Sequence, residues 1–257
     1  MTKLDSISQP WMASVLTLFP DVFPGVLGCS VIGSALKDEK WALEAIDIRD
    51  FSYNKHRSVD ARPSGGGPGM VLTPEVSARA IDSVVQGVVQ KGVARKADGA
   101  TDPRPLIYLT PRGRPLTQKR VRELASGSGV IVFCGRFEGL DERVIEARDM
   151  EEVCIGDFVL AGGEVAAQTL IEACVRLLPG VLGDDKSADE ESFEDGLLEY
   201  PLYAGLREWE GRKIPEVLLS GDHKRIREWR RAKMEKITKE RRPDLWQSYI
   251  KGKRKIE

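Results

Sequence analysis

Two glycine-rich segments follow apolar runs in the middle of the chain, and both are typical of loops that hold a ligand with main-chain groups. The first, Gly135 to Arg143, follows the β-branched run Val130 to Phe133, and the second extends from Ile155 to Glu164. Glycine reaches positive φ angles at little cost and lets a backbone approach a ligand closely. We therefore expect these segments to cradle a small molecule, although an ordinary tight turn is the alternative for either segment alone.

Two familiar phosphate-binding signatures are missing from the sequence. No Gly-Lys-Ser or Gly-Lys-Thr occurs, which excludes a P-loop. The run Gly65 to Gly69 lacks GxGxxG spacing, and Pro68 is incompatible with the helix start of a dinucleotide site. S-adenosyl-L-methionine (adenosylmethionine) suits such loops better, because its adenine edge can pair with main-chain groups and its sulfonium needs no anion site.

The elements that must position these loops alternate between strand and helix patterns. Strands are predicted at residues 13–19, 41–48, 105–109 and 130–133. Helices are predicted at residues 29–38, 74–90 and 117–125, with a further apolar helix face from Ala167 to Leu178. This alternation predicts an α/β fold with a mostly parallel sheet covered by helices on both faces. Residues 58–70 and 94–104 are expected to be loops.

Composition limits the other possibilities. No run of ~18 apolar residues occurs, so we expect no membrane span, and the N-terminal residues lack an apolar signal core, which favours the cytoplasm. The four cysteines are far apart and in apolar settings, which predicts buried reduced thiols. With two histidines only, a histidine-based metal cluster is not expected.

The charges are strongly segregated in the last third of the chain. Residues 184–199 hold eight acidic residues and one lysine, whereas residues 223–242 hold ten Lys or Arg and three Glu. We expect the acidic stretch to be a linker that is mobile without ligand. The basic stretch, with Arg230 and Arg231 beside Trp229, is a nucleic-acid candidate, and a solvated helix face is the alternative. A polar, mainly helical second domain is predicted from Tyr200 onward.

Eight ordered sequence blocks resemble the bacterial tRNA (guanine-N1)-methyltransferases. They extend over nearly the whole chain, and they are GGGPGM, LTPRGR, CGRFEGLDERV, IGDFVLAGGE, PGVLG, ESFEDGLLEYP, VLLSGDH and RRPDL. The resemblance implies an enzyme of the SPOUT class that moves a methyl group from adenosylmethionine to N1 of the guanosine 3′ of the anticodon, position 37 of tRNA. It also implies a C-terminal trefoil knot in the methyltransferase domain and a homodimer with active sites at the subunit interface.

The resemblance further implies three parts of the chain: a knotted domain at residues 1–183, a linker at 184–199 and a tRNA-binding domain at 200–257. A Mg²⁺ requirement is also implied, although no ligand cluster is legible in the sequence. The implied cofactor contacts come from three segments and are Tyr108, Leu109, Thr110, Pro111, Gly135, Arg136, Glu138, Ile155, Gly156, Asp157, Phe158, Val159, Leu160, Gly162 and Gly163.

The implied catalytic pair is Glu191 and Arg176. Glu191 directly precedes Ser-Phe, where the family usually has Asp as the base, and Arg176 would stabilise charge on the guanine O6. From the residues alone, Glu191 could be a solvated linker charge and Arg176 could pair with Glu172 four residues earlier. Implied tRNA contacts are Asp60, Arg62, Gly69, Arg230 and Arg231.

Two stretches of the sequence depart from the pattern that is usual in the family. Asp60-Ala61-Arg62-Pro63-Ser64 replaces the usual Asp-Asp-Arg-Pro-Tyr, and Tyr203-Ala204-Gly205-Leu206 replaces Tyr-Thr-Arg-Pro.

Two alternative functions remain beside the tRNA methyltransferase. The first is a SPOUT methyltransferase of ribosomal RNA or a ribose hydroxyl, and the second is a non-catalytic RNA-binding module. The acidic linker motif speaks against the first, and the three cofactor segments speak against the second.

Overall fold

The computed structural model describes residues 10–86, 102–183, 191–193 and 195–253. The chain divides into two compact units, residues 1–183 and residues 184–257. The predicted helix end at residues 87–90, most of the predicted loop at 94–104 and the first half of the acidic linker lie outside the described residues.

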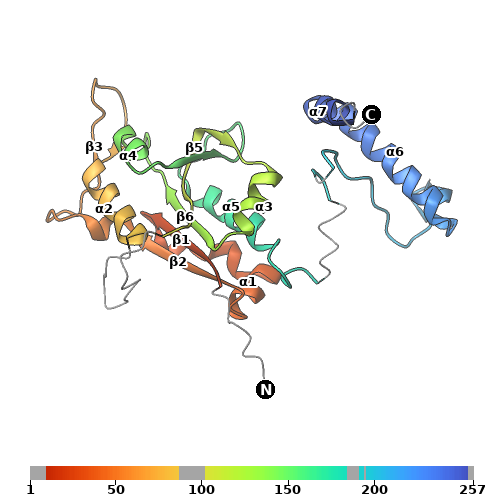
Figure 1. Ribbon diagram of the computed structural model, residues 1–257, viewed down its shortest axis with the longest axis horizontal. Coiled ribbons are helices and arrows are strands. Elements are labelled where there is room, and N and C mark those ends of the chain that lie inside the picture. The colour runs from red at the N-terminus through yellow and green to blue at the C-terminus, as the bar shows by residue number, and fades with distance from the viewer. Residues whose placement is uncertain (1–9, 87–101, 184–190, 194, 254–257) are drawn as a thin grey trace, which may run out of the picture. The chain divides into compact units, whose positions relative to one another are not determined.

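A five-stranded parallel sheet forms the centre of the first unit (Figure 1). Its strand order is β2-β1-β6-β5-β7, and every neighbouring pair is parallel. The strands are β1 (Trp11–Thr17), β2 (Trp41–Asp47), β5 (Leu106–Pro115), β6 (Gly129–Cys134) and β7 (Glu151–Cys154). All six residues of β6 are buried, as expected for a strand in the middle of a sheet covered on both sides.

The pleat of β6 divides the core into two layers. Val130 and Val132 face one cluster of apolar side chains, while Ile131 and Phe133 face the other. The first cluster includes residues of α1 (Ser30–Lys37), α3 (Gln118–Ala125) and α5 (Glu164–Val175), and the second includes residues of α2 (Pro74–Val85) and α4 (Glu142–Ala147). Figure 1 shows these two groups of helices on opposite faces of the sheet. The prediction of a parallel sheet covered on both faces is therefore confirmed.

Several boundaries differ from the sequence prediction. The first strand ends at Thr17 rather than at residue 19, because the Thr17 hydroxyl accepts from the Phe19 amide and turns the chain into η1 (Pro20–Val22), which precedes η2 (Gly25–Gly28). Strand β5 does not stop at Leu109 but continues to Pro115 through an irregularity in its pairing with β7. The predicted loop at 58–70 contains the short strand β3 (Asp60–Ala61), which pairs with β4 (Val71–Leu72). The loop comes after η3 (Ile48–Phe51) in the chain.

In the described part of the second unit, α-helix begins at His223. Residues 200–222 contain a short hairpin of β8 (Glu208–Trp209) and β9 (Arg212–Lys213), followed by η5 (Glu216–Leu219). The helices are α6 (His223–Arg241) and α7 (Pro243–Lys253). The Asp222 carboxylate caps α6 by accepting from the amides of Lys224 and Arg225.

Three cysteines are buried as predicted, but Cys29 is exposed just before α1. Burial raises the pKa of the Cys174 thiol to about 12, and it raises the pKa of Cys134 as well. Both groups are therefore uncharged thiols near neutral pH. In the part of the chain that the structure describes, no helix is both long and apolar enough to cross a bilayer.

Candidate functional site

One pocket lies at the carboxyl ends of the three neighbouring strands β6, β5 and β7. It has a cavity volume of about 240 Å³ and is lined by residues 108–111 of β5, residues 135–139 after β6, residues 153–156 and 158–163 around the end of β7, and Ala166 of α5. Ligands of open parallel sheets bind at this edge, because the loops that leave the strands gather there.

The pocket brings together all the cofactor contacts predicted from the sequence except one. Asp157 belongs to the same loop, but it is exposed and is not among the lining residues. The additional lining residues that sequence analysis missed are Phe137, Gly139, Val153, Cys154, Ala161 and Ala166. Most of them lie inside the two glycine-rich segments or directly beside them. The extent of these segments in the sequence, rather than individual residue types, was therefore the signal that could have identified them.

Two of the glycines allow the two loops to lie directly against each other. A Cβ atom on Gly163 would lie 2.8 Å from the Cα of Cys134, and the Gly163 amide donates to the Gly135 carbonyl at 2.9 Å. Next to it, Gly162 and Arg136 form an antiparallel bridge. On the side of the pocket next to α5, main chain therefore packs directly on main chain. A side chain at position 163 would not fit there.

Tyr108 fixes the opposite side of the pocket. Its hydroxyl accepts from the Leu140 amide at 3.1 Å, and its ring meets Phe133 edge-on at 6.2 Å between centroids. A Cβ on Gly135 or Gly139 would lie 3.0 Å from the same hydroxyl. Burial raises the pKa of Tyr108, so this hydroxyl stays protonated near neutral pH and serves as a spacer between the loops rather than as a base.

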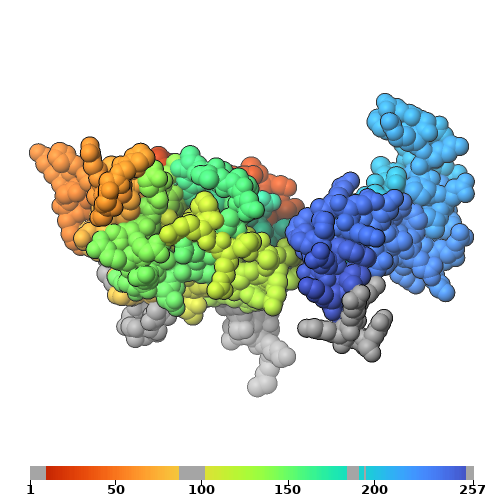
Figure 2. Space-filling view, turned by 90° about the horizontal axis from the view of Figure 1, so that it is seen from above, coloured from red at the N-terminus to blue at the C-terminus, as the bar shows by residue number. Residues whose placement is uncertain are grey.

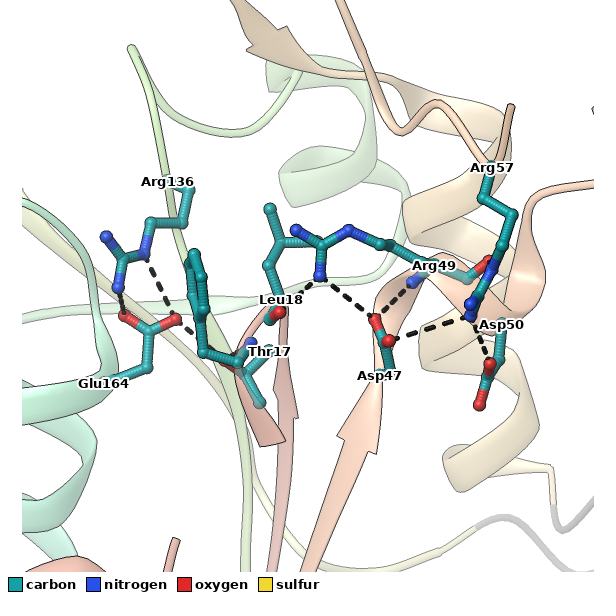
Figure 3. A network of polar contacts seen from close by, with 9 residues as sticks. Thr17, Leu18, Asp47, Arg49, Asp50, Arg57, Arg136 and Glu164 are labelled. Carbon is teal, nitrogen blue, oxygen red and sulfur yellow. Dashed lines mark hydrogen bonds and ion pairs between the residues drawn. The ribbon is translucent and has the colours of Figure 1, made fainter. Parts of the chain in front are cut away.

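A buried ion pair connects the pocket to the end of β1 (Figure 3). Glu164, 4% exposed at the start of α5, lies 2.9 Å from Arg136 and accepts a 2.7 Å hydrogen bond from the Thr17 hydroxyl. Arg136 also donates to the Ala161 carbonyl and lies 4.4 Å from the ring centroid of Phe19. The positive end of α5 favours the carboxylate at this place.

Sequence analysis named Arg136 as a ligand contact but did not single out its partners. Glu164 closes the IGDFVLAGGE block, so a carboxylate directly after two glycines was the available signal for it. Thr17 carries no local signal, because it is 147 residues away from Glu164. The three side chains together fix the conformations of both glycine loops relative to the sheet.

The predicted guanosine contacts lie in a segment that is attached to the same pocket. A Cβ on Gly69 would lie 2.3 Å from the Glu138 carboxylate, and the Glu138 amide donates to the Met70 carbonyl at 2.9 Å. Asp60 is half-buried in β3, whereas Arg62 is exposed. Figure 2 shows this segment, in orange, next to the green surface that includes the loop after β6.

The predicted catalytic and basic residues lie elsewhere. Arg176 caps the far end of α5, twelve residues beyond Glu164 and thus ~18 Å along the helix axis from the pocket end, and it does not line the pocket. Glu191, Arg230 and Arg231 belong to the second unit. Within the described residues, no group of three or more His, Cys, Asp or Glu is placed to hold a metal ion.

The fold and the pocket define an α/β protein that takes a small molecule at the carboxyl ends of parallel strands. A family model described as tRNA (Guanine-1)-methyltransferase TrmD matches residues 12–248. The tRNA (guanine-N(1)-)-methyltransferase of Brucella ovis is 55% identical over 244 residues, which cover 95% of each chain. The Brucella suis biovar 1 enzyme of the same name is 55% identical over 95% of this chain and 93% of its own. The chain belongs to the tRNA (guanine-1)-methyltransferase family.

We expect Glu164→Gln to lower the free energy of unfolding by ~1–3 kcal/mol, because the amide keeps the side-chain shape but loses the charge that pairs with Arg136. Urea denaturation measures this change. Glu172→Gln is the matched control, since Glu172 is exposed on the same helix and its loss should stay within ~0.5 kcal/mol. Equal losses in the two variants would mean that the buried ion pair contributes nothing to stability.

Proposed function

We propose that the chain transfers a methyl group from adenosylmethionine to N1 of the guanosine 3′ of the anticodon in tRNA. The observation that carries this proposal is the pocket itself, since the segments that line it are those for which the resemblance to the family implies cofactor contacts. The high identity to enzymes named for this reaction supports it independently.

The pocket residues fit adenosylmethionine in chemical character. The lining contains glycines and apolar side chains that leave main-chain groups accessible to an adenine edge, and no lysine is among them. Glu138 is the only carboxylate in the lining, which suits a positively charged sulfonium. The cavity of about 240 Å³ is slightly below the usual range of ~300–1,000 Å³.

A trefoil knot in the first unit also belongs to this proposal. The support is the close contact at Gly163, where the segment after β7 lies against the backbone of Cys134 and Gly135 at the end of β6. The loops of a knotted cofactor site would pack as closely as this, although knots are rare among protein folds.

The chemistry requires a base at N1 and a positive charge near O6 of the guanine. When bound, adenosylmethionine supplies an electrophilic methyl group. The Glu191 carboxylate would accept the N1 proton while the methyl group passes to N1 and its bond to the sulfonium sulfur breaks, which leaves S-adenosylhomocysteine. Arg176 would stabilise the negative charge that develops on O6. Neither residue lines the pocket in one chain.

A homodimer would complete the site with residues from a second subunit. Arg176 lies at the end of α5 away from its own pocket, so within one subunit this helix cannot bring the guanidinium to the bound methyl group. The first unit also exposes apolar side chains around η1, η2 and α5, with Gln168 of α5 donating to the Val22 carbonyl. Exposed apolar surface of this kind marks an interface; its members are Phe19, Val22, Val26, Val31 and Val165.

The basic helix α6 is the proposed tRNA-binding element, through phosphate contacts of its exposed cations. Exposed Lys and Arg side chains on α6 include Lys224, Arg225 and Lys239. A Mg²⁺ requirement stays a prediction; because the described residues offer no cluster of ligands, no step of the mechanism is assigned to a metal ion.

Incubation with labelled adenosylmethionine and unmodified tRNA should give N1-methylguanosine as the only methylated nucleoside. Glu191→Gln should lower kcat by ~10²–10⁴-fold with cofactor affinity unchanged, because the amide cannot accept the proton. Glu191→Asp should retain more activity, since it keeps a carboxylate. Methylation on a ribose hydroxyl or at another guanine atom would refute the assignment, and wild-type turnover by Glu191→Gln would move the base elsewhere.

Mixed dimers test whether one site uses both subunits. Gly163→Val should abolish cofactor binding by pushing a side chain into the contact between the two loops, and Glu191→Gln should remove the base. Each variant alone should lose most or all of its activity, and co-expression should restore partial activity if the pocket and the base of one site come from different subunits. Mixtures as inactive as the single variants would place both groups in one subunit, and a monomer in sedimentation would exclude the dimer.

A further inference from the structure

The segment that carries Glu191 does not hang free but closes on itself directly after that residue. The Phe193 amide donates to the Leu197 carbonyl at 2.7 Å, and the Glu199 amide donates to the Ser192 hydroxyl at 3.1 Å. Phe193 holds a φ of +80°, which a bulky residue rarely adopts unless its surroundings impose it. We name residues 192, 193 and 195–199 the linker clasp.

A buried contact attaches the linker clasp to α6. The Leu198 amide donates to the Thr238 hydroxyl at 2.8 Å, and the same hydroxyl donates to the Met234 carbonyl at 2.7 Å. Thr238 is fully buried, and so is the adjacent Leu197. The Leu198 amide is half-buried, and leaving it without an acceptor costs free energy, so the Thr238 hydroxyl specifies where the clasp sits on the helix.

A second contact is ionic and takes up Arg231, which the sequence suggested as a tRNA contact. The Arg231 guanidinium donates to Asp195 of the clasp at 2.7 Å and to the Tyr249 hydroxyl at 2.8 Å. The Tyr249 hydroxyl in turn donates to Glu235 at 2.7 Å. The neighbouring Arg230 lies 4.6 Å from the ring centroid of Tyr200, just after the clasp. Both arginines therefore face the segment that follows Glu191.

We propose that Thr238, Asp195 and Arg231 are positioning residues for Glu191, an inference that rests on the proposed function of Glu191 as the base. One peptide bond separates Glu191 from the clasp, so fixing the clasp on α6 removes much of the backbone freedom of the base before substrate arrives. Ordering a residue in advance lowers the entropy cost of reaching the reactive geometry. The helix α6 thus carries the base, and Arg231 stabilises the clasp instead of binding a phosphate.

The first experiment compares two substitutions at the buried hydroxyl. Thr238→Val keeps the shape but leaves the Leu198 amide without an acceptor, so kcat should fall at least about fivefold, with KM for tRNA and cofactor affinity unchanged. Thr238→Ser keeps the hydroxyl and should restore kcat. Ser248→Ala is the matched control, because the exposed Ser248 hydroxyl also donates to a helix carbonyl but does not contact the clasp. Hydrogen exchange at the Leu198 amide should accelerate in Thr238→Val only.

The second experiment uses Asp195→Asn, whose side chain is exposed enough that folding should not be at risk. If Arg231 serves the clasp, this variant lowers kcat about twofold to fivefold. If Arg231 instead grips a phosphate, releasing it from Asp195 lowers KM for tRNA and leaves kcat alone. Arg231→Gln separates the two in the same way, because a lost phosphate contact would flatten the dependence of log K on log salt by ~0.7–0.9.

The inference is overturned if Thr238→Val and Thr238→Ser both turn over like the wild type, or if Arg231→Gln changes only KM and the salt slope. A wild-type enzyme that forms no N1-methylguanosine would instead refute the proposed function, so the two failures are distinguishable. Cooperative thermal unfolding of each variant, monitored by circular dichroism, shows that a loss of kcat does not come from unfolding of the second unit.

Discussion

The close contact of two main-chain segments at Gly163 is the constraint on which the rest of the pocket depends. Because the 155–163 loop lies against the backbone at Cys134 and Gly135, the ends of β6 and β7 cannot move independently. The ion pair of the buried Glu164 and the half-buried Arg136 then fixes this contact to β1 through Thr17. A pocket made of main chain needs such external anchoring, since glycines contribute no side-chain packing of their own.

The parallel sheet explains why the pocket forms at this edge. All five strands run in one direction, so the loops after β6 and β7 and the irregular second half of β5 emerge together. The apolar clusters on both faces bury the strands and leave their carboxyl ends as the place where main-chain groups remain accessible. The loop around Gly69 contacts Glu138, which brings a segment with predicted substrate contacts next to the pocket.

Local patterns in the sequence predicted four of the five strands of the sheet, but not β7, and the α-helices of the first unit except α4. The resemblance to the family implied fourteen of the twenty residues that line the pocket. Apolar periodicity marks buried strands and helices, and glycines mark the places where backbones approach closely. Thr17 and Arg231 show what local patterns miss. Thr17 contacts Glu164, which lies 147 residues later in the sequence. The basic run around Arg231 resembles a phosphate-binding face, but in the structure Arg231 donates to Asp195 and Tyr249. Such pairings are set by tertiary packing, which spacing along the chain does not encode.

The contacts of Asp195 and Leu198 with α6 give a structural reason for the opposite charges of the acidic segment and this helix. A linker that was only mobile would have to order around the guanosine at every turnover, and the entropy cost would fall on the catalytic step. Pairing Asp195 with Arg231 and seating the Leu198 amide on Thr238 orders the residues after Glu191 in advance. The ion pair of Asp195 and Arg231 is largely exposed to solvent, which limits its strength. The contact with the buried Thr238 must therefore provide most of the positional specificity. In the function proposed above, the remaining cations of α6 would be left for the RNA, so that one helix would both orient the base and attract the substrate.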